Sequence, residues 1–162
     1  MQIRKLQKSD IDRVADIWLN ANLNAHYFIP SQYWNDNFEP VKDMLPQAEV
    51  YVYECNGKIQ GFIGVNGGYI EGIFVSEEVR SQGIGKLLLN YAKDRKAKLS
   101  LNVYQKNTRA IRFYEREGFD IKCEGLDEAT GEKDYEMIWE REPDLSVIYK
   151  KRGQYERVGV SI

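Results

Sequence analysis

The sequence is poor in the residues that build covalent or metal-bound frameworks. Among its 162 residues it has two cysteines, Cys55 and Cys123, and a single histidine, His26. Two widely separated cysteines are too few for a disulfide framework or a metal site, so we expect neither. We expect instead a pair of free thiols in a reducing cytoplasm.

Long apolar runs and an excess of one charge are also missing. No run approaches the roughly 20 apolar residues that span a bilayer, and the opening segment MQIRKLQKSD lacks the apolar region of a secretory signal. Lysine and arginine number 23 against 25 aspartates and glutamates, a formal net charge of −2. A general nucleic-acid binder would carry a basic face. We therefore expect a cytoplasmic protein that binds neither membrane nor nucleic acid.

What is present is a regular pattern of strands and helices. Residues 50–55 alternate valine with tyrosine, which is typical of a strand, and residues 11–18 carry apolar side chains at i, i+3, i+4 and i+7, which is typical of a helix. Such patterns predict strands over 2–6, 50–55, 58–65, 69–75, 99–103, 119–123 and 135–139, and helices over 11–18, 32–44, 84–91 and 110–114. The order β-α-α-β-β-β-α-β-α-β-β predicts an α/β fold with a central mixed sheet flanked by helices.

Local signals predict where several elements begin and end. Ser9 is expected to be a helix N-cap, with Asp12 completing a capping box. Asn56-Gly57 favours a tight hairpin because both residues tolerate positive φ. Gly118 is expected to end the last helix as a C-terminal glycine.

The most informative segment is Arg80-Ser81-Gln82-Gly83-Ile84-Gly85, which follows a strand and opens a helix. Glycines at a helix start leave backbone N–H groups uncovered, and the helix dipole adds positive charge, so a phosphate or pyrophosphate can dock there. Arg80 and Lys86 can add full charges. A dinucleotide motif would need a third glycine where Leu88 stands, and a Walker loop would need a hydroxyl where Leu87 stands. Both of these interpretations are disfavoured, while a purely structural glycine turn stays open.

A second segment, residues 107–119, joins this loop in a resemblance. It carries, at fixed spacing, Asn107, Ala110, Phe113, Tyr114, Gly118 and Phe119. Together the two segments resemble the GCN5-related N-acetyltransferase (GNAT) superfamily, whose signature combines Arg/Gln-x-x-Gly-x-Gly/Ala with Asn-x-x-Ala-x-x-Phe-Tyr-x-x-x-Gly-Phe. The resemblance covers residues 2–141. It implies a GNAT-like fold and transfer of an acetyl group from acetyl-coenzyme A (acetyl-CoA) to a primary amine, by direct attack in a ternary complex and without a metal.

The resemblance also implies which residues hold acetyl-CoA. In the family the pantetheine arm lies like an extra strand between two splayed parallel strands, here residues 69–75 and 99–104. The Ile73 N–H would then stabilise the oxyanion that forms on attack, and the loop at 80–85 would hold the pyrophosphate. The implied cofactor-binding residues are Ile73, Phe74, Val75, Arg80, Ser81, Gln82, Gly83, Ile84, Gly85, Lys86, Asn107 and Tyr114.

Two residues are implied in catalysis. Tyr114 occupies the family's general-acid position, and a phenol with a pKa of about 10 can protonate or hydrogen-bond the leaving thiolate. Glu71 precedes Ile73 by two residues, so strand alternation predicts that its side chain faces the acetyl group and takes the proton of the amine. The alternatives are a core aromatic for Tyr114 and an ordinary solvent-facing carboxylate for Glu71.

The acceptor side is expected to involve His26, Tyr27, Phe28 and Asn102. In the superfamily the segment between the first two helices lines the acceptor cleft, so His26 would be a base or an acceptor contact, with a structural histidine as the alternative. Asn102, on the neighbouring strand, would help to place a water or the thioester. The acceptor is expected to be a small-molecule or peptide amine, and its identity stays open.

Three further expectations concern the whole chain. Residues 1–142 are expected to form a single N-acetyltransferase domain, and residues 143–162 a C-terminal tail of open role. A homodimer is compatible with the resemblance, since dimers are common in such families. A non-catalytic acyl-CoA-binding module of the same fold is the alternative function, and it would not need Tyr114 or Glu71.

Overall fold

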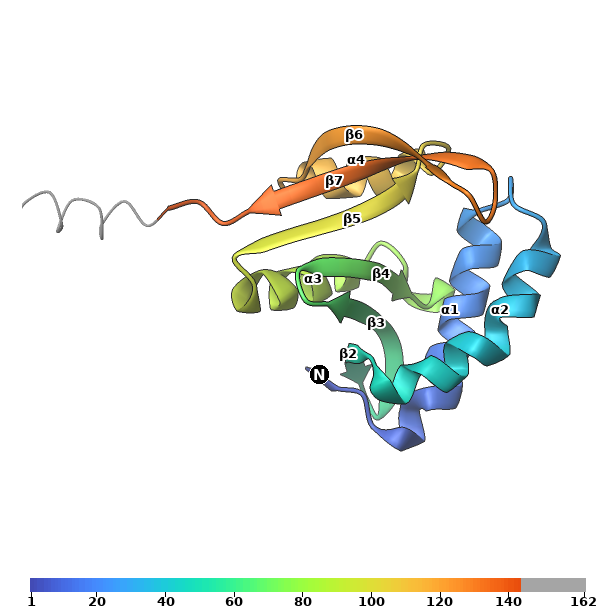
Figure 1. The fold of residues 1–162 in the computed structure, drawn as a ribbon. Helices are drawn as coiled ribbons and strands as arrows, with labels where there is room; N and C mark the ends of the chain where they lie inside the picture. The colour runs from blue at the N-terminus through green and yellow to red at the C-terminus, as the bar shows by residue number, and fades with distance from the viewer. Residues whose placement is uncertain (144–162) are drawn as a thin grey trace, which may run out of the picture.

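The computed structural model describes residues 1–143, so the tail expected from residue 143 onward lies outside the described residues except for Pro143. Within residues 1–143 a seven-stranded sheet has the order β1-β2-β3-β4-β5-β7-β6 (Figure 1). Its strands are β1 (Gln2–Lys5), β2 (Glu49–Cys55), β3 (Lys58–Asn66), β4 (Tyr69–Val75), β5 (Lys98–Tyr104), β6 (Asp120–Asp127) and β7 (Glu132–Glu140). The helices are α1 (Ile11–Ala25), α2 (Ser31–Met44), α3 (Ile84–Arg95) and α4 (Thr108–Arg116). The predicted order of strands and helices is confirmed.

The sheet consists of two antiparallel halves joined by one parallel contact. Strands β1 to β4 pair antiparallel, and so do β5, β7 and β6. Between the halves, β4 and β5 run parallel and pair at Tyr69 and Ser100 alone. Beyond that point the two strands diverge, as Figure 1 shows. We call this divergence the splay.

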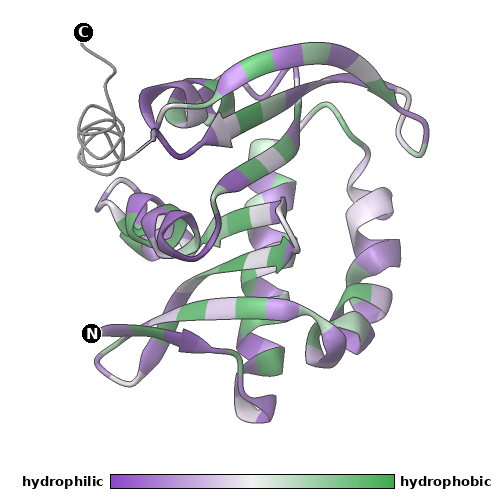
Figure 2. Ribbon diagram, turned by 60° about the vertical axis from the view of Figure 1, so that its left-hand side comes forward, coloured by the Kyte–Doolittle hydropathy of each residue, from purple (hydrophilic) through white to green (hydrophobic). Residues whose placement is uncertain are grey.

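Apolar side chains pack against both faces of the sheet. On one face, α3 and α4 cover a cluster that includes Leu88, Leu99 and Phe119. On the other face, Val14 of α1 packs with Phe62 in a second cluster. Figure 2 shows hydrophobic and hydrophilic residues alternating along the strands, as the pleat requires when the two sides of a strand face different surroundings. The two clusters fix α3 and α4 on one face of the sheet and α1 and α2 on the other.

The capping box predicted for Ser9 and Asp12 is wrong. A single 3-10 turn precedes α1, and its box is formed by Gln7 and Asp10 instead. The Asp10 carboxylate accepts the Gln7 N–H at 2.8 Å and lies 2.7 Å from the Arg4 guanidinium. This long-range ion pair to β1 draws Asp10 inward to 7 % exposure, which local pattern does not reveal.

The predicted hairpin turn and the predicted end of the last helix are confirmed, while several helices and strands extend beyond their predicted limits. Asn56 (φ 53°) and Gly57 (φ 75°) form the β2–β3 hairpin turn, and Gly118 (φ 90°) follows the end of α4. The strand predicted at 119–123 is wrong in its extent, because β6 begins at Asp120 and continues to Asp127. Strand β6 lies at the edge of the sheet with exposed side chains. An exposed edge strand does not need alternating apolar residues, so the sequence of β6 gives little indication of where the strand ends.

Candidate active site

The loop at residues 80–85, which we call the glycine loop, presents uncovered backbone at the start of α3. Gly83 is the helix N-cap in a left-handed conformation, with φ at 82°. Ser81 also has a positive φ, 63°, which is uncommon for a residue with a Cβ. The first N–H groups of a helix have no partner within it, and the dipole makes this end positive. The loop is thus suited to an anion such as a pyrophosphate.

A cation that the sequence did not indicate lies beside this loop. Arg109, in the first turn of α4, donates a hydrogen bond from Nη2 to the Ser81 hydroxyl oxygen at 3.1 Å. It stands two residues after Asn107, whose Oδ1 accepts the Ala110 N–H at 3.2 Å and so caps α4. The predicted N-cap at Asn107 is confirmed. The cap fixes the turn from which Arg109 reaches the loop.

A β-bulge in β4 changes where Glu71 points. Gly64 of β3 pairs with Gly72, and the next pair skips Glu71. A Cβ built on Gly64 would lie 3.6 Å from the Cβ of Glu71, so Glu71 and Gly72 stand on the same face of the sheet. Ile73 instead packs into the cluster under α3 and α4. The expectation that Glu71 shares a face with Ile73 is therefore wrong, because strict alternation fails at a bulge.

Tyr114 of α4 is buried close to Tyr69 of β4, one of the two strands that form the splay. Its side chain is 8 % exposed, and its hydroxyl makes no hydrogen bond within residues 1–143. Burial raises the pKa of the Tyr114 phenol above its usual range, and the nearby Tyr69 phenol raises this pKa further. Tyr69 in turn donates a hydrogen bond to Oδ1 of Asn102 at 2.9 Å. The fold thus brings Tyr114, Tyr69 and Asn102 together from α4, β4 and β5.

His26 contacts α4 through Asn107. The Nδ2 of Asn107 and the Nε2 of His26 are 3.2 Å apart. Since Oδ1 of Asn107 accepts from Ala110, its Nδ2 is the donor and His26 Nε2 the acceptor. The proton of the ring is then on Nδ1, which is buried without a partner. Burial lowers the pKa of His26 to about 4, so its imidazole is neutral at physiological pH.

Aromatic rings surround His26. Its ring stacks on Trp34 with centroids 5.3 Å apart and meets Phe28 and Tyr104 edge-on at 5.7 and 5.0 Å. We call His26, Phe28, Trp34 and Tyr104 the aromatic wall. Tyr27, also predicted at the acceptor side, is 81 % exposed. The wall joins the α1–α2 connection to the end of β5.

Carboxylates gather next to this wall on β6 and β7. Asp127 accepts hydrogen bonds from the Tyr104 hydroxyl at 2.6 Å and the Thr130 hydroxyl at 3.0 Å. Asp134 of β7 pairs with Tyr104 of β5 and is 9 % exposed. Asp134 was not predicted as a site residue. An isolated glycine inside a strand, Gly125 opposite it in β6, was the available signal, since such glycines often mark a close approach.

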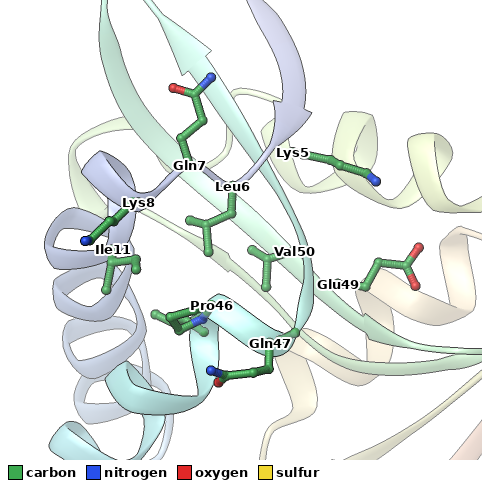
Figure 3. Close-up of a pocket in the computed structure, with 11 residues that line it drawn as sticks. Lys5, Leu6, Gln7, Lys8, Ile11, Pro46, Gln47, Glu49 and Val50 are labelled. Atoms are coloured by element: carbon green, nitrogen blue, oxygen red, sulfur yellow. The ribbon is translucent and has the colours of Figure 1, made fainter.

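A separate pocket of about 600 Å³ lies at the other edge of the sheet (Figure 3). It is lined by the end of β1, the turn into α1 and the segment before β2, including Leu6, Ile11, Pro46 and Val50. Three strands separate β1 from the splay between β4 and β5. The pocket is therefore not part of the site around Tyr114.

Comparisons with known proteins agree with this geometry. An acetyltransferase (GNAT) domain model matches residues 46–121. The chain is 38 % identical over 129 residues to the peptidyl-lysine N-acetyltransferase YiaC of Escherichia coli K12, covering 78 % of this chain and 88 % of YiaC. The chain belongs to the GNAT acetyltransferase family. It is 29 % identical over 150 residues to the peptidyl-lysine N-acetyltransferase YjaB of Salmonella typhimurium LT2, covering 92 % of this chain and 98 % of YjaB.

A solved structure supports the GNAT fold. The apo form of YjaB from Escherichia coli superposes with a TM-score of 0.77 at 23 % identity, covering 85 % of this chain and 96 % of that chain. This GNAT protein is accordingly an N-acetyltransferase that takes its acetyl group from acetyl-CoA and delivers it to an amine. The alternative of a non-catalytic acyl-CoA-binding module finds no support in these relatives. None of the helices in residues 1–143 is long and apolar enough to cross a membrane.

The predicted residues of this acetyltransferase fall into two groups. The loop residues Ser81, Gln82 and Gly83 are exposed at the start of α3. By contrast, Ile84 is 5 % exposed and packs in the core, and the Phe74 ring stacks on Phe62 at 4.9 Å. These two residues can contribute their backbone groups. Within residues 1–143 no three His, Cys, Asp or Glu side chains are arranged to hold a metal ion.

Proposed function

We propose that this acetyltransferase modifies lysine side chains of peptides or proteins. The observation that carries the proposal is the acidic character of the face beside the splay: Asp127 and Asp134 lie next to Tyr104 of the aromatic wall. Glu71 lies near Tyr69. A lysine ammonium is attracted to such carboxylates, and its aliphatic stem packs well on aromatic rings. Acetylation of peptidyl-lysine is also the activity in the names of YiaC and YjaB.

We propose that acetyl-CoA binds across the splay. Its pyrophosphate would lie on the glycine loop, where Arg80 and Arg109 are close to the start of α3. Its pantetheine arm would use the backbone groups of Ile73 and Val75, because β4 has no ladder partner in β5 beyond Tyr69. Lys86 is exposed in the first turn of α3 and can contact a phosphate. Backbone N–H groups aimed at the thioester oxygen would stabilise the oxyanion.

Tyr114 is proposed as the general acid. Its raised pKa keeps the phenol protonated at neutral pH, so a proton is available for the thiolate that leaves. The hydroxyl has no partner within the described residues, and thus its donor is free for the sulfur. Glu71 is proposed as the base, acting from the face of α1 directly or through water. Its side chain is exposed and forms no ion pair within residues 1–143.

Direct attack of the amine on the thioester is the proposed route, since holding the two reactants together supplies much of the acceleration. Cys55 lies at the end of β2, and Cys123 lies on the edge strand β6. The Cys123 thiol donates a hydrogen bond to Glu136 at 3.3 Å, and neither thiol is hydrogen-bonded to Tyr114 or Glu71 within residues 1–143. Mass spectrometry after mixing with acetyl-CoA should show no kinetically competent acetyl adduct on either cysteine.

We further propose that residues 1–142 are a single catalytic domain acting in the cytoplasm. The sheet is continuous from β1 to β6, and the clusters on its two faces involve all four helices. Cutting the chain after residue 142 should leave acetyl-CoA binding intact. Loss of binding in the truncated protein would assign the tail to the domain.

The acceptor is tested with matched peptides. The enzyme is incubated with acetyl-CoA and an N-terminally blocked peptide that contains one lysine. The comparison acceptors are the same peptide with norleucine in place of lysine and a free N-terminus, a free amino acid and a polyamine. The blocked lysine peptide should give the highest kcat/KM. Preferential acetylation of the peptide N-terminus or of the polyamine would overturn the proposal.

A further inference from the structure

Asp134 is a buried carboxylate that has no compensating cation among residues 1–143. It is 9 % exposed, and its Oδ1 is shielded from solvent with no hydrogen-bond partner in residues 1–143. The ion pairs of the described chain involve other carboxylates. A buried carboxylate oxygen left unpaired costs free energy. A buried polar group of this kind calls for an explanation, and a ligand that supplies the missing charge is one.

Gly125 provides the space that this oxygen occupies. A Cβ built on Gly125 would lie only 2.6 Å from Oδ1 of Asp134. Gly125 is not in the left-handed region, so its backbone does not require a glycine. The missing side chain is therefore what allows the Asp134 carboxylate to lie over β6.

The other side of the carboxylate is held by neighbouring residues. The Asn102 side chain lies beside Asp134 and stabilises its ionised form. Oδ1 of Asn102 accepts the Tyr69 hydroxyl, which turns the amide nitrogen of Asn102 away from Tyr69. Asn102 and Tyr69 lie at the splay, so this chain of contacts leads from the proposed thioester site to Asp134. No side chain in residues 1–143 adds a positive charge to the Asp134 carboxylate.

The surroundings favour a positive ligand. Asp127, which adds negative potential, already accepts hydrogen bonds from Tyr104 and Thr130. Burial and the charge of Asp127 raise the pKa of Asp134. Tyr104, opposite Asp134 in β5, belongs to the aromatic wall. An alkylammonium can use both features, with its charge on the carboxylate and its stem on the rings.

We infer that Asp134 binds the ammonium group of the acceptor lysine and is a specificity-determining residue of the enzyme. This inference rests on the proposed activity toward peptidyl-lysine. The ammonium has three N–H donors and one positive charge, and so it can offset the charge of the Asp134 carboxylate. Asp134 selects the amine, and Glu71, the proposed base, takes the proton that the amine loses.

Two variants of the full chain test this role against one control. Asp134→Asn keeps the shape and removes the charge. Gly125→Ala keeps the charge and displaces Oδ1, since its Cβ would need the same space. Glu136→Gln removes a carboxylate from the same strand, one that is paired instead with Lys122 at 3.7 Å. A charge-assisted hydrogen bond predicts a rise in the KM for the lysine peptide of about ten- to a hundredfold in Asp134→Asn, with a smaller rise in Gly125→Ala.

The controls must separate selection of the amine from damage to the fold. The affinity for acetyl-CoA, measured by calorimetry, should stay within about twofold of wild type in all three variants, and Glu136→Gln should keep the wild-type KM. Binding of the lysine peptide and of its norleucine analogue is then compared in the presence of CoA. Wild type should prefer lysine, and Asp134→Asn should lose this preference.

The outcomes distinguish the two claims. Wild-type enzyme that acetylates no lysine peptide overturns the proposed function, and this inference with it. Normal turnover of lysine peptides together with an unchanged KM and lysine preference in Asp134→Asn overturns the role of Asp134 alone. An equal rise in KM in Glu136→Gln would also overturn it, because the effect would then come from the general negative potential.

Discussion

Substitutions at Gly83 separate the backbone contribution of the glycine loop from its charge. Gly83 has φ at +82°, and a Cβ built there meets nothing within 4 Å. Gly83→Ala therefore introduces no clash, and its cost is the left-handed conformation, about 1 to 2 kcal/mol for an L-residue. Gly83→Asn costs less, because asparagine tolerates this region. Gly83→Asp has the shape of asparagine with a negative charge.

That negative charge should act directly on the cofactor. If the pyrophosphate lies on the glycine loop, the carboxylate of Gly83→Asp repels it at close range. Two charges at 4 Å interact by about 4 kcal/mol near a protein surface, and screening at this exposed position reduces the effect to about 1 to 2 kcal/mol. The Kd for acetyl-CoA should then rise about five- to thirtyfold relative to Gly83→Asn.

Calorimetric titration with acetyl-CoA is the assay, with NADH as a ligand that should give no saturable binding. Gly131→Ala is the matched control, since Gly131 also has a positive φ (76°) and open space but lies in the β6–β7 turn. It should keep the wild-type affinity. Equal Kd values for Gly83→Asn and Gly83→Asp would refute the placement of the pyrophosphate on this loop.

Three other predictions concern catalysis, pH and packing. Tyr114→Phe should lower kcat at least tenfold with an unchanged Kd for acetyl-CoA; wild-type kcat in that variant would remove the phenol from the mechanism. His26 has its pKa lowered from 6.5 to about 4, so the neutral ring stabilises the fold fully above pH 6.5, and this contribution is lost as pH falls toward 4. The free energy of unfolding in urea should fall by about 3 kcal/mol more over that pH range in wild type than in His26→Gln. Identical pH profiles for the two proteins would contradict this role of His26. Gly61→Ala should destabilise the protein by about 1 to 3 kcal/mol in the same assay, because its Cβ would lie 3.0 Å from the Phe74 carbonyl and 3.2 Å from Ile84. Gly64→Ala, with its nearest neighbour at 3.6 Å, is the control and should change stability far less.

Much of the fold could be predicted because its signals are local. The Asn56-Gly57 turn, the Asn107 cap and the Gly118 helix end each depend on the conformational preference of one or two residues. The capping box of α1 could not be predicted in this way. Asp10 is held by Arg4 of β1, and that contact depends on how the strand and the helix meet.

The candidate site also has a part that local sequence predicts and a part that depends on how the strands pair. The glycine loop is a contiguous segment, so the prediction of an anion site there and the resemblance that the loop carries could both be made from the sequence. Glu71 was expected on the face of Ile73, and a bulge opposite Gly64 placed it on the other face. A bulge arises from the pairing of two strands and breaks the simple alternation from which side-chain direction is read.

The sequence by itself determined the family, the order of the elements and the loop that suits a phosphate, because these depend on short segments and on residue spacing. Only the tertiary structure decided which side chains meet at the acceptor side. His26 is bound to Asn107 across 81 positions of the chain. Asp134 is buried because Gly125 and Tyr104, on the strands to either side, leave room for its carboxylate and cover it. Such contacts join strands and helices far apart in the chain, and the energy of a buried charge depends on everything packed around it.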